Sequence, residues 1–444
     1  MSKFLKSISL TLAVISVSVL FSFPYVLRAE TPVVEKALYA YLYSVDTNQV
    51  LFRKNADHKI YPASFVKIMT AILALEYYGS NITQKITVTA EAIENIDKSG
   101  NYIALQEGEI LTAEQLINAI IVGGANDATN VIAYDVAGGI EEFVALMNEK
   151  AVIIGTVQTI FTNPTGIHDE KMYTTLDDFA KIALYAYRLN RFSEMASQRT
   201  YIIPPTNMSN RQRRITNRNL FVSPHLVTKY YDREALGLNA GATPQAGQCL
   251  ATVVNHDGLT YLCIITGASS DEENIYSYIE ARKLLDWVYS SWHFVTVLKS
   301  TDAICEIPVT LSGDADSIAL YPQYEIDLYL PMDADIAKEV DRYVVVYENE
   351  LKAPVESNFK AGELSLYYKG ELISAVPLIT KTYVDQSRFM YFVDTVNQVT
   401  KTRLFRTTVS VFILLMILYV ILTSVFRYQS KLRKKRRRQT KTKN

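Results

Sequence analysis

The chain has 444 residues, of which 20% are charged, and its formal net charge is −1. Ten of the positive charges follow residue 426 and three lie in the first 29 residues, so residues 30–426 carry a net charge of −14. This acidic balance argues against non-specific binding of nucleic acid. The five histidines show no metal-ligand spacing and there is no glycine-rich phosphate loop, so we expect neither a metal nor a cofactor.

The first 29 residues have the pattern of a signal peptide. Lys3, Lys6 and Arg28 are the only charged residues, and an apolar run lies between Lys6 and Arg28. Cleavage is predicted after Ala29. Because Leu27 is larger than the small residue preferred at that position, an uncleaved anchor is the alternative. Both alternatives export the chain that follows.

About 400 exported residues exceed the size at which a single core usually divides, so we expect two domains, residues 30–296 and 297–383. The predicted elements of the first are a hairpin over 37–53, helices over 64–78, 113–122, 126–136, 141–154 and 175–190, strands over 248–254 and 260–267, and a helix near 271–291. Strands at both ends with helices between them predict the α+β class, with an antiparallel sheet covered by helices.

The second domain differs in its pattern. Short alternating runs such as 343–347 and 364–368 predict a small all-β domain. The chain from 384 to 406 is expected to be a polar linker or stalk.

The C-terminal end predicts a membrane anchor. Residues 407–426 carry no charge and are long enough to cross a bilayer of roughly 30 Å. Residues 427–444 contain ten basic residues and no acid, which marks the cytoplasmic side. A nucleic-acid-binding role for this tail is rejected because the tail adjoins the span. The exported domains are therefore expected outside the cell membrane, held by one C-terminal transmembrane helix.

The segment Pro62–Lys67 carries the strongest chemical signal. Ser64 lies three positions before Lys67, at the start of an apolar run that predicts a buried helix. On a helix, such positions share a face with Cβ atoms about 5–6 Å apart, so the amine can reach the hydroxyl. A desolvated lysine can take the serine proton and leave a nucleophile. Ser357 and Lys360 have the same spacing in a β-rich surface region, where no catalysis is expected.

Three cysteines are too few for a disulfide framework. Cys249 and Cys263 flank a hairpin turn predicted at 256–258. A bridge between them is conceivable, but the sequence does not assign the register that decides it.

Over roughly residues 37–380 the chain resembles the low-molecular-weight penicillin-binding proteins, the serine D-alanyl-D-alanine carboxypeptidases of bacterial cell walls. The stretches that carry the resemblance follow the family's order: the first box with its flank at 57–70, the second box at 124–128, then 161–167, 203–207, the third box within 237–251, and 351–354 and 370–373 near the C-terminus. The resemblance implies a β-lactamase/transpeptidase-like domain followed by the β-rich domain.

The resemblance also implies a mechanism. Ser64 would attack the carbonyl between the two terminal D-alanines of a peptidoglycan stem peptide, with Lys67 as general base. Backbone N–H groups of Ser64 and Ala242 would hold the oxyanion. Asn126 would hydrogen-bond the substrate backbone or steer Lys67. The expected partners are a stem peptide ending in D-Ala-D-Ala, β-lactams that acylate the same serine, and the bacterial cytoplasmic membrane.

Two boxes depart from the family's pattern. Gly124 stands where the family has a serine that relays a proton toward the leaving amine. The third box, Lys-Thr-Gly in the family, reads Asn239-Ala240-Gly241, so the ammonium and hydroxyl that bind the terminal carboxylate are missing, while Gly241 still permits a close approach. Their joint loss, roughly 2–5 kcal/mol, would lower kcat/KM by about 30-fold to several-thousand-fold.

The missing cation also bears on the base. Without it, the pKa of Lys67 is expected to climb toward its free value of roughly 10.4. Arg233 or Lys229, just upstream, are candidates to replace the charge. The prediction is therefore a carboxypeptidase of reduced activity. The alternative is a protein of the same fold that binds or scaffolds wall peptide without cleaving it; a β-lactamase is less favoured, because no equivalent of the acidic residue that helps water deacylate is found.

Overall fold

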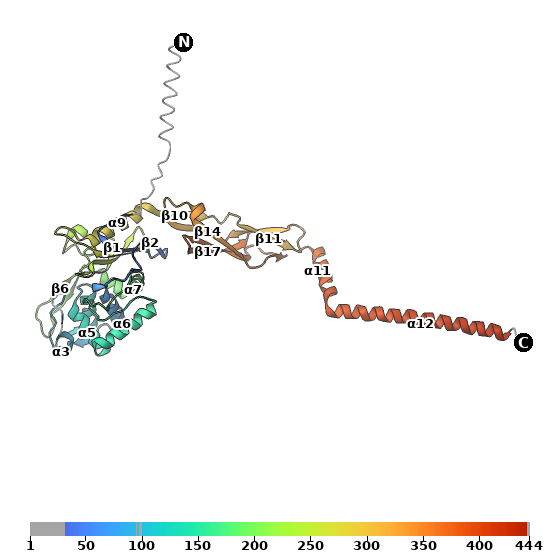
Figure 1. Cartoon of the computed structure of the whole chain (residues 1–444), viewed down its shortest axis with the longest axis horizontal. Coiled ribbons are helices and arrows are strands. Elements are labelled where there is room, and N and C mark those ends of the chain that lie inside the picture. The colour runs from blue at the N-terminus through green and yellow to red at the C-terminus, as the bar shows by residue number, and fades with distance from the viewer. Residues whose placement is uncertain (1–31, 95, 97–99, 442–444) are drawn as a thin grey trace, which may run out of the picture. The chain divides into compact units, whose positions relative to one another are not determined.

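The computed structural model describes residues 32–94, 96 and 100–441. The predicted signal peptide, residues 1–29, lies outside the described residues. The described residues form two compact units. The first comprises the chain up to His293 together with Tyr329–Asp333, and the second comprises Phe294–Leu328 and the residues from Ala334 on (Figure 1).

A five-stranded antiparallel sheet is the centre of the first unit. Its strands lie in the order β2-β1-β9-β8-β7, so the N-terminal hairpin pairs with strands from the far end of the unit. The strands are β1 (Ala37–Ser44), β2 (Gln49–Lys54), β7 (Ala235–Thr243), β8 (Gly247–His256) and β9 (Leu259–Ala268). This confirms the predicted α+β class, and it shows in addition that the early strand β1 pairs with the late strand β9.

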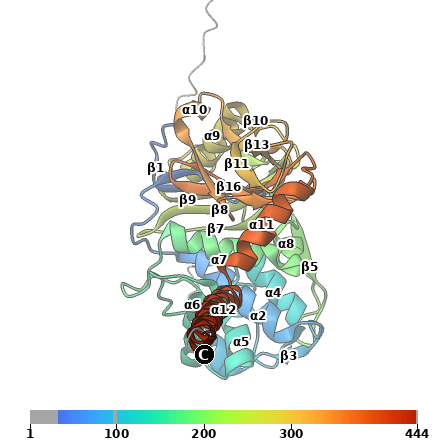
Figure 2. The same cartoon turned by 90° about the vertical axis from the view of Figure 1, so that its right-hand side faces the viewer.

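Helices cover both faces of this sheet (Figure 2). On β9, Leu262 and Ile264 face a large core shared with the helices of the middle of the chain, whereas Cys263 and Ile265 face a second core under α9 (Tyr276–Ser291). Because successive side chains of a strand point to opposite faces, a strand covered on both sides is a continuous apolar run.

The remaining elements of the first unit lie between β2 and β7. The helices are α2 (Val66–Tyr78), α3 (Ala90–Ile93), α4 (Ala113–Ile121), α5 (Asn126–Ala137), α6 (Ile140–Ile154), α7 (Leu176–Arg188) and α8 (Asn190–Ala196), with 3-10 turns η1 (Ala63–Phe65) and η2 (Thr228–Tyr230). Two short hairpins pair β3 (Lys85–Thr87) with β4 (Ile110–Thr112) and β5 (Thr200–Ile203) with β6 (Arg213–Thr216).

Helix α2 is buried on almost every side, as its dense apolar sequence predicts. It packs against α4, α5 and α7, and Phe65 at its start stacks on Phe179 with ring centroids 4.3 Å apart. Only Leu73, Glu76 and Tyr77 of the helix are not buried. This burial fixes the residues at its N-terminal end.

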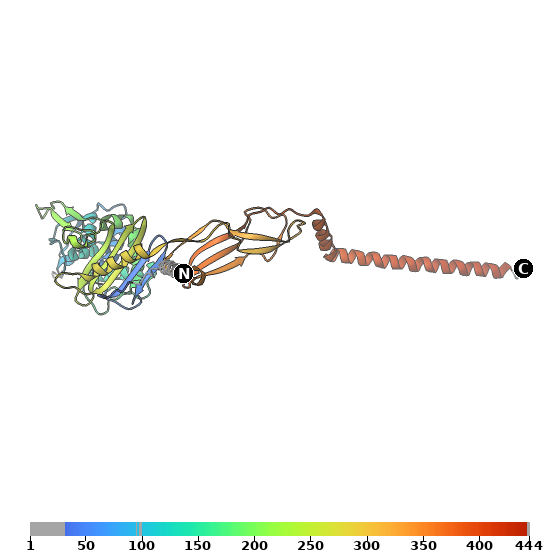
Figure 3. The same ribbon diagram turned by 90° about the horizontal axis from the view of Figure 1, so that it is seen from above.

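The second unit is built around a six-stranded sheet with the order β14-β16-β17-β12-β11-β15 (Figure 3). The strands are β11 (Cys305–Thr310), β12 (Ser317–Pro322), β14 (Val340–Val346), β15 (Leu351–Lys352), β16 (Lys360–Tyr368) and β17 (Glu371–Thr380). A separate ladder joins β10 (Trp292–Leu298) to β13 (Ile326–Pro331), and α10 spans Ile336–Glu339. The expectation of a small all-β second domain is confirmed.

Two helices follow this sheet. The segment expected to be a linker contains α11 (Arg388–Lys401), and the span predicted at 407–426 lies within α12 (Arg403–Lys441). Within Arg403–Arg433 of α12 the 18-residue window that marks the candidate span has a mean hydropathy of 2.7, and the helix is long and apolar enough to cross a membrane.

Cys249 and Cys263 do not form a disulfide, because their side chains lie on opposite faces of the sheet. Cys249 on β8 lies in the helical core, and Cys263 on β9 lies in the core under α9, so the two side chains point to opposite sides. Both thiols are free. Burial raises the pKa of each to about 12, which makes them inert structural residues.

Candidate active site

A cleft of about 570 Å³ opens in the first unit beside the start of α2. Of the residues predicted from the three boxes and the residue after the third, all but one line it: Ser64, Lys67, Gly124, Asn126, Ala240, Gly241 and Ala242. The exception is Asn239. Four segments far apart in the sequence therefore meet at one place, namely η1 with α2, the start of α5, the loop after α6 and strand β7.

Ser64 lies in the 3-10 turn η1 rather than in the α-helix proper. The preceding residue, Ala63, has a φ of +47°, a left-handed conformation that is costly for a residue with a side chain. Such strain is maintained only where the surroundings fix the backbone, and it occurs often at functional sites. The turn presents the Ser64 side chain to the cleft, whereas Ala63 and Phe65 are buried.

Lys67 is the buried base candidate. The residue is 4% exposed, and its Nζ donates a hydrogen bond of 2.5 Å to the backbone carbonyl of Thr165. Burial lowers the pKa of Lys67 to about 8. The expected climb toward 10.4 is therefore wrong: desolvation by the surrounding core lowers this pKa without a neighbouring cation. At pH 7 about a tenth of such an amine is neutral.

The carbonyl that holds Lys67 belongs to a turn built around Asn163. The Asn163 side-chain oxygen accepts hydrogen bonds from the backbone N–H groups of Thr165 and Gly166. Gly166 has a φ of +78°, and a Cβ there would come within 1.9 Å of the Ala63 carbonyl oxygen. Only glycine fits, so the Asn-Pro-Thr-Gly sequence reflects a tight contact against the nucleophile turn.

Strand β7 forms the opposite wall. A Cβ added to Gly241 would lie 2.4 Å from Ser64 Oγ and 2.6 Å from Ser64 Cβ, so the strand passes in direct contact with the serine. Ala240 and Ala242 also line the cleft. Asn239 is 6% exposed and does not line it. Asn239, which occupies the position of the family's third-box lysine, is therefore buried and does not reach the open part of the cleft.

Two glycines at or beside the second box pack closely against asparagine side chains. A Cβ at Gly100 would meet the Asn126 side-chain nitrogen at 2.5 Å. Gly124 has a φ of +66°, and a Cβ there would lie 3.3 Å from the side-chain nitrogen of Asn101. The Asn126 backbone N–H donates to the carbonyl of Asn101 at 2.7 Å. The amide of Asn101 therefore lies next to the position where the family carries a serine side chain.

The segment that carries Asn101 is tied to the next residue of α5. Asp127 is fully buried, and its carboxylate accepts hydrogen bonds from the backbone N–H groups of Ile103 and Leu105. Burial raises the pKa of this carboxyl, and the backbone donors act in the opposite sense. Asp127 positions the cleft wall without lining the cleft.

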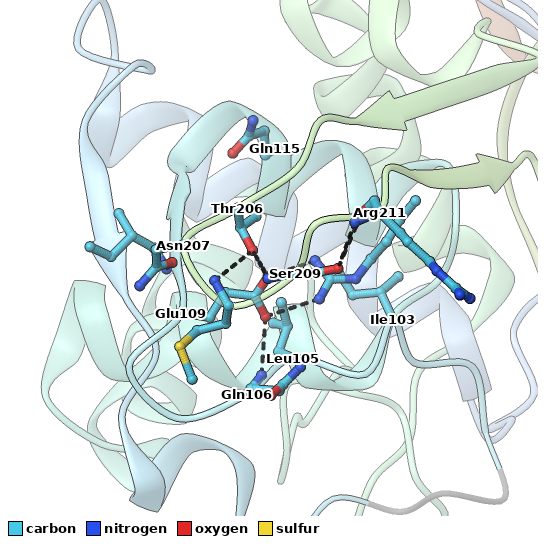
Figure 4. Close-up of polar contacts among 12 residues, drawn as sticks. Ile103, Leu105, Gln106, Glu109, Gln115, Thr206, Asn207, Ser209 and Arg211 are labelled. Carbon is cyan, nitrogen blue, oxygen red and sulfur yellow. Dashed lines mark hydrogen bonds and ion pairs between the residues drawn. The ribbon is translucent and has the colours of Figure 1, made fainter.

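The buried carboxylate of Glu109 also holds this segment in place (Figure 4). The side chain of Glu109 is fully buried and accepts two hydrogen bonds from Arg213 on β6, at 2.7 and 3.0 Å, and one from the Thr206 hydroxyl at 2.6 Å. Asn207 adds two bonds to the backbone of Gly108 and Ile110. The β5–β6 hairpin is thereby held to the chain that continues from Asn101.

The two cations proposed to replace the third-box lysine lie elsewhere. Arg233 has a side chain 85% exposed, and its nearest carboxylate is Glu234 at 4.0 Å. The Lys229 ammonium donates to the backbone carbonyl of Glu273 and to the side-chain oxygen of Asn274. Neither lines the cleft. The arginine that lines it is Arg218, which sequence reasoning missed, although its position between Asn217 and Asn219 in a loop was a signal that could have drawn attention.

Two family models match the chain. One, described as D-alanyl-D-alanine carboxypeptidase, matches residues 28–270. The other, described as the C-terminal domain of penicillin-binding protein 5, matches residues 295–386. Together they cover both structural units.

Curated proteins similar to this chain carry related names. This chain is 26% identical over 357 residues to D-alanyl-D-alanine carboxypeptidase DacF of Bacillus subtilis strain 168. The alignment covers 80% of this chain and 87% of the relative. It is 24% identical over 350 residues to D-alanyl-D-alanine carboxypeptidase DacC of Escherichia coli K12, covering 77% of this chain and 83% of the relative.

Solved structures show the same fold. Penicillin-binding protein 5 from Haemophilus influenzae matches with a TM-score of 0.59 and 23% identity, covering 80% of this chain and 99% of that one. D-alanyl-D-alanine carboxypeptidase DacD from Francisella tularensis matches with a TM-score of 0.60 and 20% identity, covering 82% and 100%.

Proposed function

This chain belongs to the D-alanyl-D-alanine carboxypeptidase family of serine-type enzymes, and from this premise we propose that it removes the terminal D-alanine of peptidoglycan stem peptides through an acyl-serine intermediate. The observation that carries the proposal is that Ser64, which is partly exposed, lines the same cleft as the buried Lys67, whose pKa is lowered to about 8. A lysine in this state can accept a proton at physiological pH.

The proposed reaction begins at Ser64. Neutral Lys67 takes the hydroxyl proton as the serine oxygen attacks the carbonyl carbon between the two D-alanines. The backbone N–H groups of Ser64 and Ala242 stabilise the oxyanion. When the peptide bond breaks, the proton passes from Lys67 to the leaving amine of D-alanine. Water then hydrolyses the acyl-serine and restores both residues.

The altered boxes lower the proposed rate. Gly124 has no hydroxyl to relay the proton to the leaving amine, so Lys67 or water must deliver it less directly. Ala240 has no hydroxyl for the terminal carboxylate. The depressed pKa of Lys67 offsets part of this loss, since about a tenth of the amine is neutral at pH 7 instead of less than a thousandth at its free pKa.

The proposed location follows from the C-terminal end. Helix α12 contains the apolar span, and ten basic residues follow residue 426. A basic flank stays in the cytoplasm, so the catalytic unit lies on the outer side of the bacterial cell membrane, where peptidoglycan is. β-Lactams are proposed as ligands that acylate Ser64.

The second candidate function is a protein that binds wall peptide without cleaving it. It is favoured by the loss of the second-box hydroxyl at Gly124 and by the position of Asn239 outside the cleft. Both functions use the same cleft, and only turnover separates them.

The test is acylation and turnover by the full-length chain in membranes. A fluorescent penicillin is expected to label the wild type, and Ser64→Ala is expected to abolish the label. Release of D-alanine from a peptide ending in D-Ala-D-Ala then separates the two candidates. Label without release supports the binding protein, and absence of both at saturating penicillin rejects the enzyme.

A further inference from the structure

The backbone of Asn101 is fixed beside the second box. Its carbonyl accepts a hydrogen bond of 2.7 Å from the backbone N–H of Asn126. The preceding residue, Gly100, packs so closely on Asn126 that a Cβ there would lie 2.5 Å from the side-chain nitrogen. Two residues after Asn101, the N–H of Ile103 donates to the carboxylate of the buried Asp127. The first two residues of α5 therefore hold the chain on both sides of Asn101.

The side chain of Asn101 reaches the space that Gly124 leaves open. Its nitrogen Nδ2 lies 3.3 Å from the place that a Cβ of residue 124 would occupy, and the hydroxyl of a serine would be one bond beyond that Cβ. Asn101 is exposed and lines the cleft together with Ser64 and Lys67. The amide belongs to a different segment from the second box, yet it stands at the same wall of the cleft.

The amide of Asn101 is available to a ligand. Within the part of the chain that the structure describes, its side chain makes no hydrogen bond. A carboxamide offers one acceptor oxygen and two N–H donors. Because no described residue bonds this amide, rotation about its last side-chain torsion can turn either atom toward the cleft. The Lys67 ammonium, by contrast, is already bonded to the carbonyl of Thr165.

We propose that the Asn101 carboxamide replaces one contact of the missing second-box hydroxyl: its oxygen accepts the N–H of the scissile peptide bond and so orients the leaving nitrogen toward Lys67. The inference rests on the proposed function, because it assigns a substrate contact in the same cleft. A carboxamide neither gives nor takes a proton near neutral pH. Asn101 therefore supplies the hydrogen bond of a hydroxyl but not its proton relay, and the proton comes from Lys67.

The role of this contact is clear from the acylation step. The Ser64 oxygen forms an ester bond to the carbonyl carbon while the C–N bond breaks. The electron pair of that bond stays on the nitrogen, which takes the proton that Lys67 received from Ser64. A hydrogen bond from the original N–H to Asn101 fixes the direction of the lone pair during this transfer. D-Alanine leaves with a neutral amine, and Lys67 is again neutral.

The contact separates substrates that have an N–H at the leaving atom from those that do not. A depsipeptide ending in D-Ala-D-lactate has the same terminal carboxylate, but an ester oxygen stands in place of the N–H. The nitrogen of a β-lactam ring also carries no hydrogen. Neither compound can donate to Asn101, so only cleavage of the peptide should depend on the amide.

The experiment compares kcat/KM of the detergent-solubilised full chain for a peptide ending in D-Ala-D-Ala and for its D-Ala-D-lactate counterpart. Asn101→Ala is expected to lower kcat/KM for the peptide about 3- to 10-fold. It is expected to change kcat/KM for the ester, and the rate of labelling by fluorescent penicillin, less than about twofold. Asn81→Ala removes an exposed amide outside the cleft and is the matched control, expected to behave as wild type.

Asn101→Asp tests which atom of the amide matters. It keeps an acceptor oxygen and removes the NH₂ group. Its added charge faces the same terminal carboxylate in both substrates, so the ratio of kcat/KM for peptide to that for ester is expected to stay within about twofold of wild type. A ratio that falls as far as in Asn101→Ala would assign the effect to the NH₂ group and overturn the inference.

The remaining outcomes are equally decisive. An equal loss for peptide and ester in Asn101→Ala overturns the inference, because a structural role would affect both, and so does an unchanged kcat/KM for the peptide. A wild type that takes penicillin but cleaves neither substrate also overturns it, since the contact then promotes no cleavage. A wild type that cleaves neither and takes no penicillin at Ser64 rejects the proposed function instead. Thermal melting shows whether each variant keeps its fold.

Discussion

Gly241 and Ser64 touch across the cleft with no room for a single added carbon: a Cβ at position 241 would lie 2.4 Å from Ser64 Oγ. The strand that carries the third box is therefore the surface against which the nucleophile is placed. The glycine of that box is retained although the two residues before it have changed. The contact with the serine leaves no space for a side chain at position 241, whereas positions 239 and 240 are not constrained by it.

Gly241→Ala is expected to reduce labelling of Ser64 by fluorescent penicillin at least 100-fold. The added methyl group overlaps the serine oxygen, so either the strand or the serine must shift away from the position needed for attack. The rate of acylation by the full-length chain in membranes measures this. Gly313→Ala is a matched control, because a Cβ there meets its neighbours at 3.7 Å and its backbone is not left-handed. Normal labelling of Gly241→Ala would show that β7 does not contact the nucleophile in solution.

The pH dependence of acylation reports on Lys67. Its pKa is lowered to about 8 by burial, so the neutral amine increases with pH, reaches half near pH 8 and is nearly complete about one pH unit higher. The second-order rate constant for penicillin labelling is expected to rise about tenfold per pH unit below about pH 7 and to level off above about pH 9. Lys67→Arg, which stays charged, is expected to lose labelling at every pH. A rate that does not change between pH 6 and pH 9 would remove Lys67 as the general base.

A cation introduced at the third-box lysine position is expected to shift the pH dependence of acylation. Asn239 and Gly241 share one face of β7, because side chains alternate along a strand, and that face meets Ser64. In Asn239→Lys a second ammonium disfavours the charged form of Lys67, so the pKa of Lys67 falls further and the rising limb shifts to lower pH. The variant with Ala240→Thr in addition is expected to gain turnover on D-Ala-D-Ala peptide. An unchanged midpoint would show that position 239 lies too far from the base to affect it.

Much of this architecture was predictable because local sequence signals agreed with the fold. The dense apolar run after Ser64 predicted a buried helix, and α2 has it. The hairpin at 37–53 and the two late strands, with helices between them, predicted the α+β class; the structure adds that β1 pairs with β9. Arg218 was not predictable in the same way. Its place in the cleft lining depends on Asn217 and Asn219 being buried on either side, and on a cleft that forms only when segments far apart in the sequence come together.

The state of Lys67 was likewise hidden in tertiary structure. Sequence reasoning required a desolvated lysine, but it could not tell how deeply the fold buries Lys67, and the charge lost from the third box led it to expect a pKa near the free value. The desolvation that lowers the pKa comes from the Thr165 turn and the core around α2, which are almost a hundred residues apart in the chain. The identity of a base can be read from a motif, but its ionisation depends on packing.

The ion pair behind the cleft wall is expected to be a strong determinant of stability. Burial alone would raise the pKa of Glu109, but hydrogen bonds from Arg213, Thr206 and a backbone N–H lower it below its ordinary value. Arg213→Met leaves a buried carboxylate without its partner and is expected to cost about 3–5 kcal/mol of unfolding free energy. Adding Glu109→Gln should recover part of this. Thermal melting of the detergent-solubilised chain measures both variants.

The pH dependence of stability is a second test of the Glu109–Arg213 ion pair, and an exposed ion pair serves as its control. Because the pKa of folded Glu109 is depressed, its contribution is present above the unfolded value of roughly 4.3 and is lost as the pH falls through the folded pKa. The pair of Lys338 with Asp335 is exposed, so Lys338→Met should change the melting temperature little. Equal effects of Arg213→Met and Lys338→Met would contradict a special role for the buried pair.

Restoring the second-box serine alone is expected to fail. A serine at position 124 must adopt a φ near +66°, which costs about 1–2 kcal/mol for a residue with a side chain, and its Cβ would press on the amide of Asn101 at 3.3 Å. Gly124→Ser should therefore lower the melting temperature without raising release of D-alanine. Gly138→Ser carries a similar left-handed φ of +82° with nothing within 4 Å, so it isolates the backbone strain from the contact. Combining Gly124→Ser with Asn101→Gly vacates the space for the hydroxyl and is expected to raise turnover above that of Gly124→Ser alone. If the single variant is already faster than wild type, Asn101 does not occupy the position of the missing side chain.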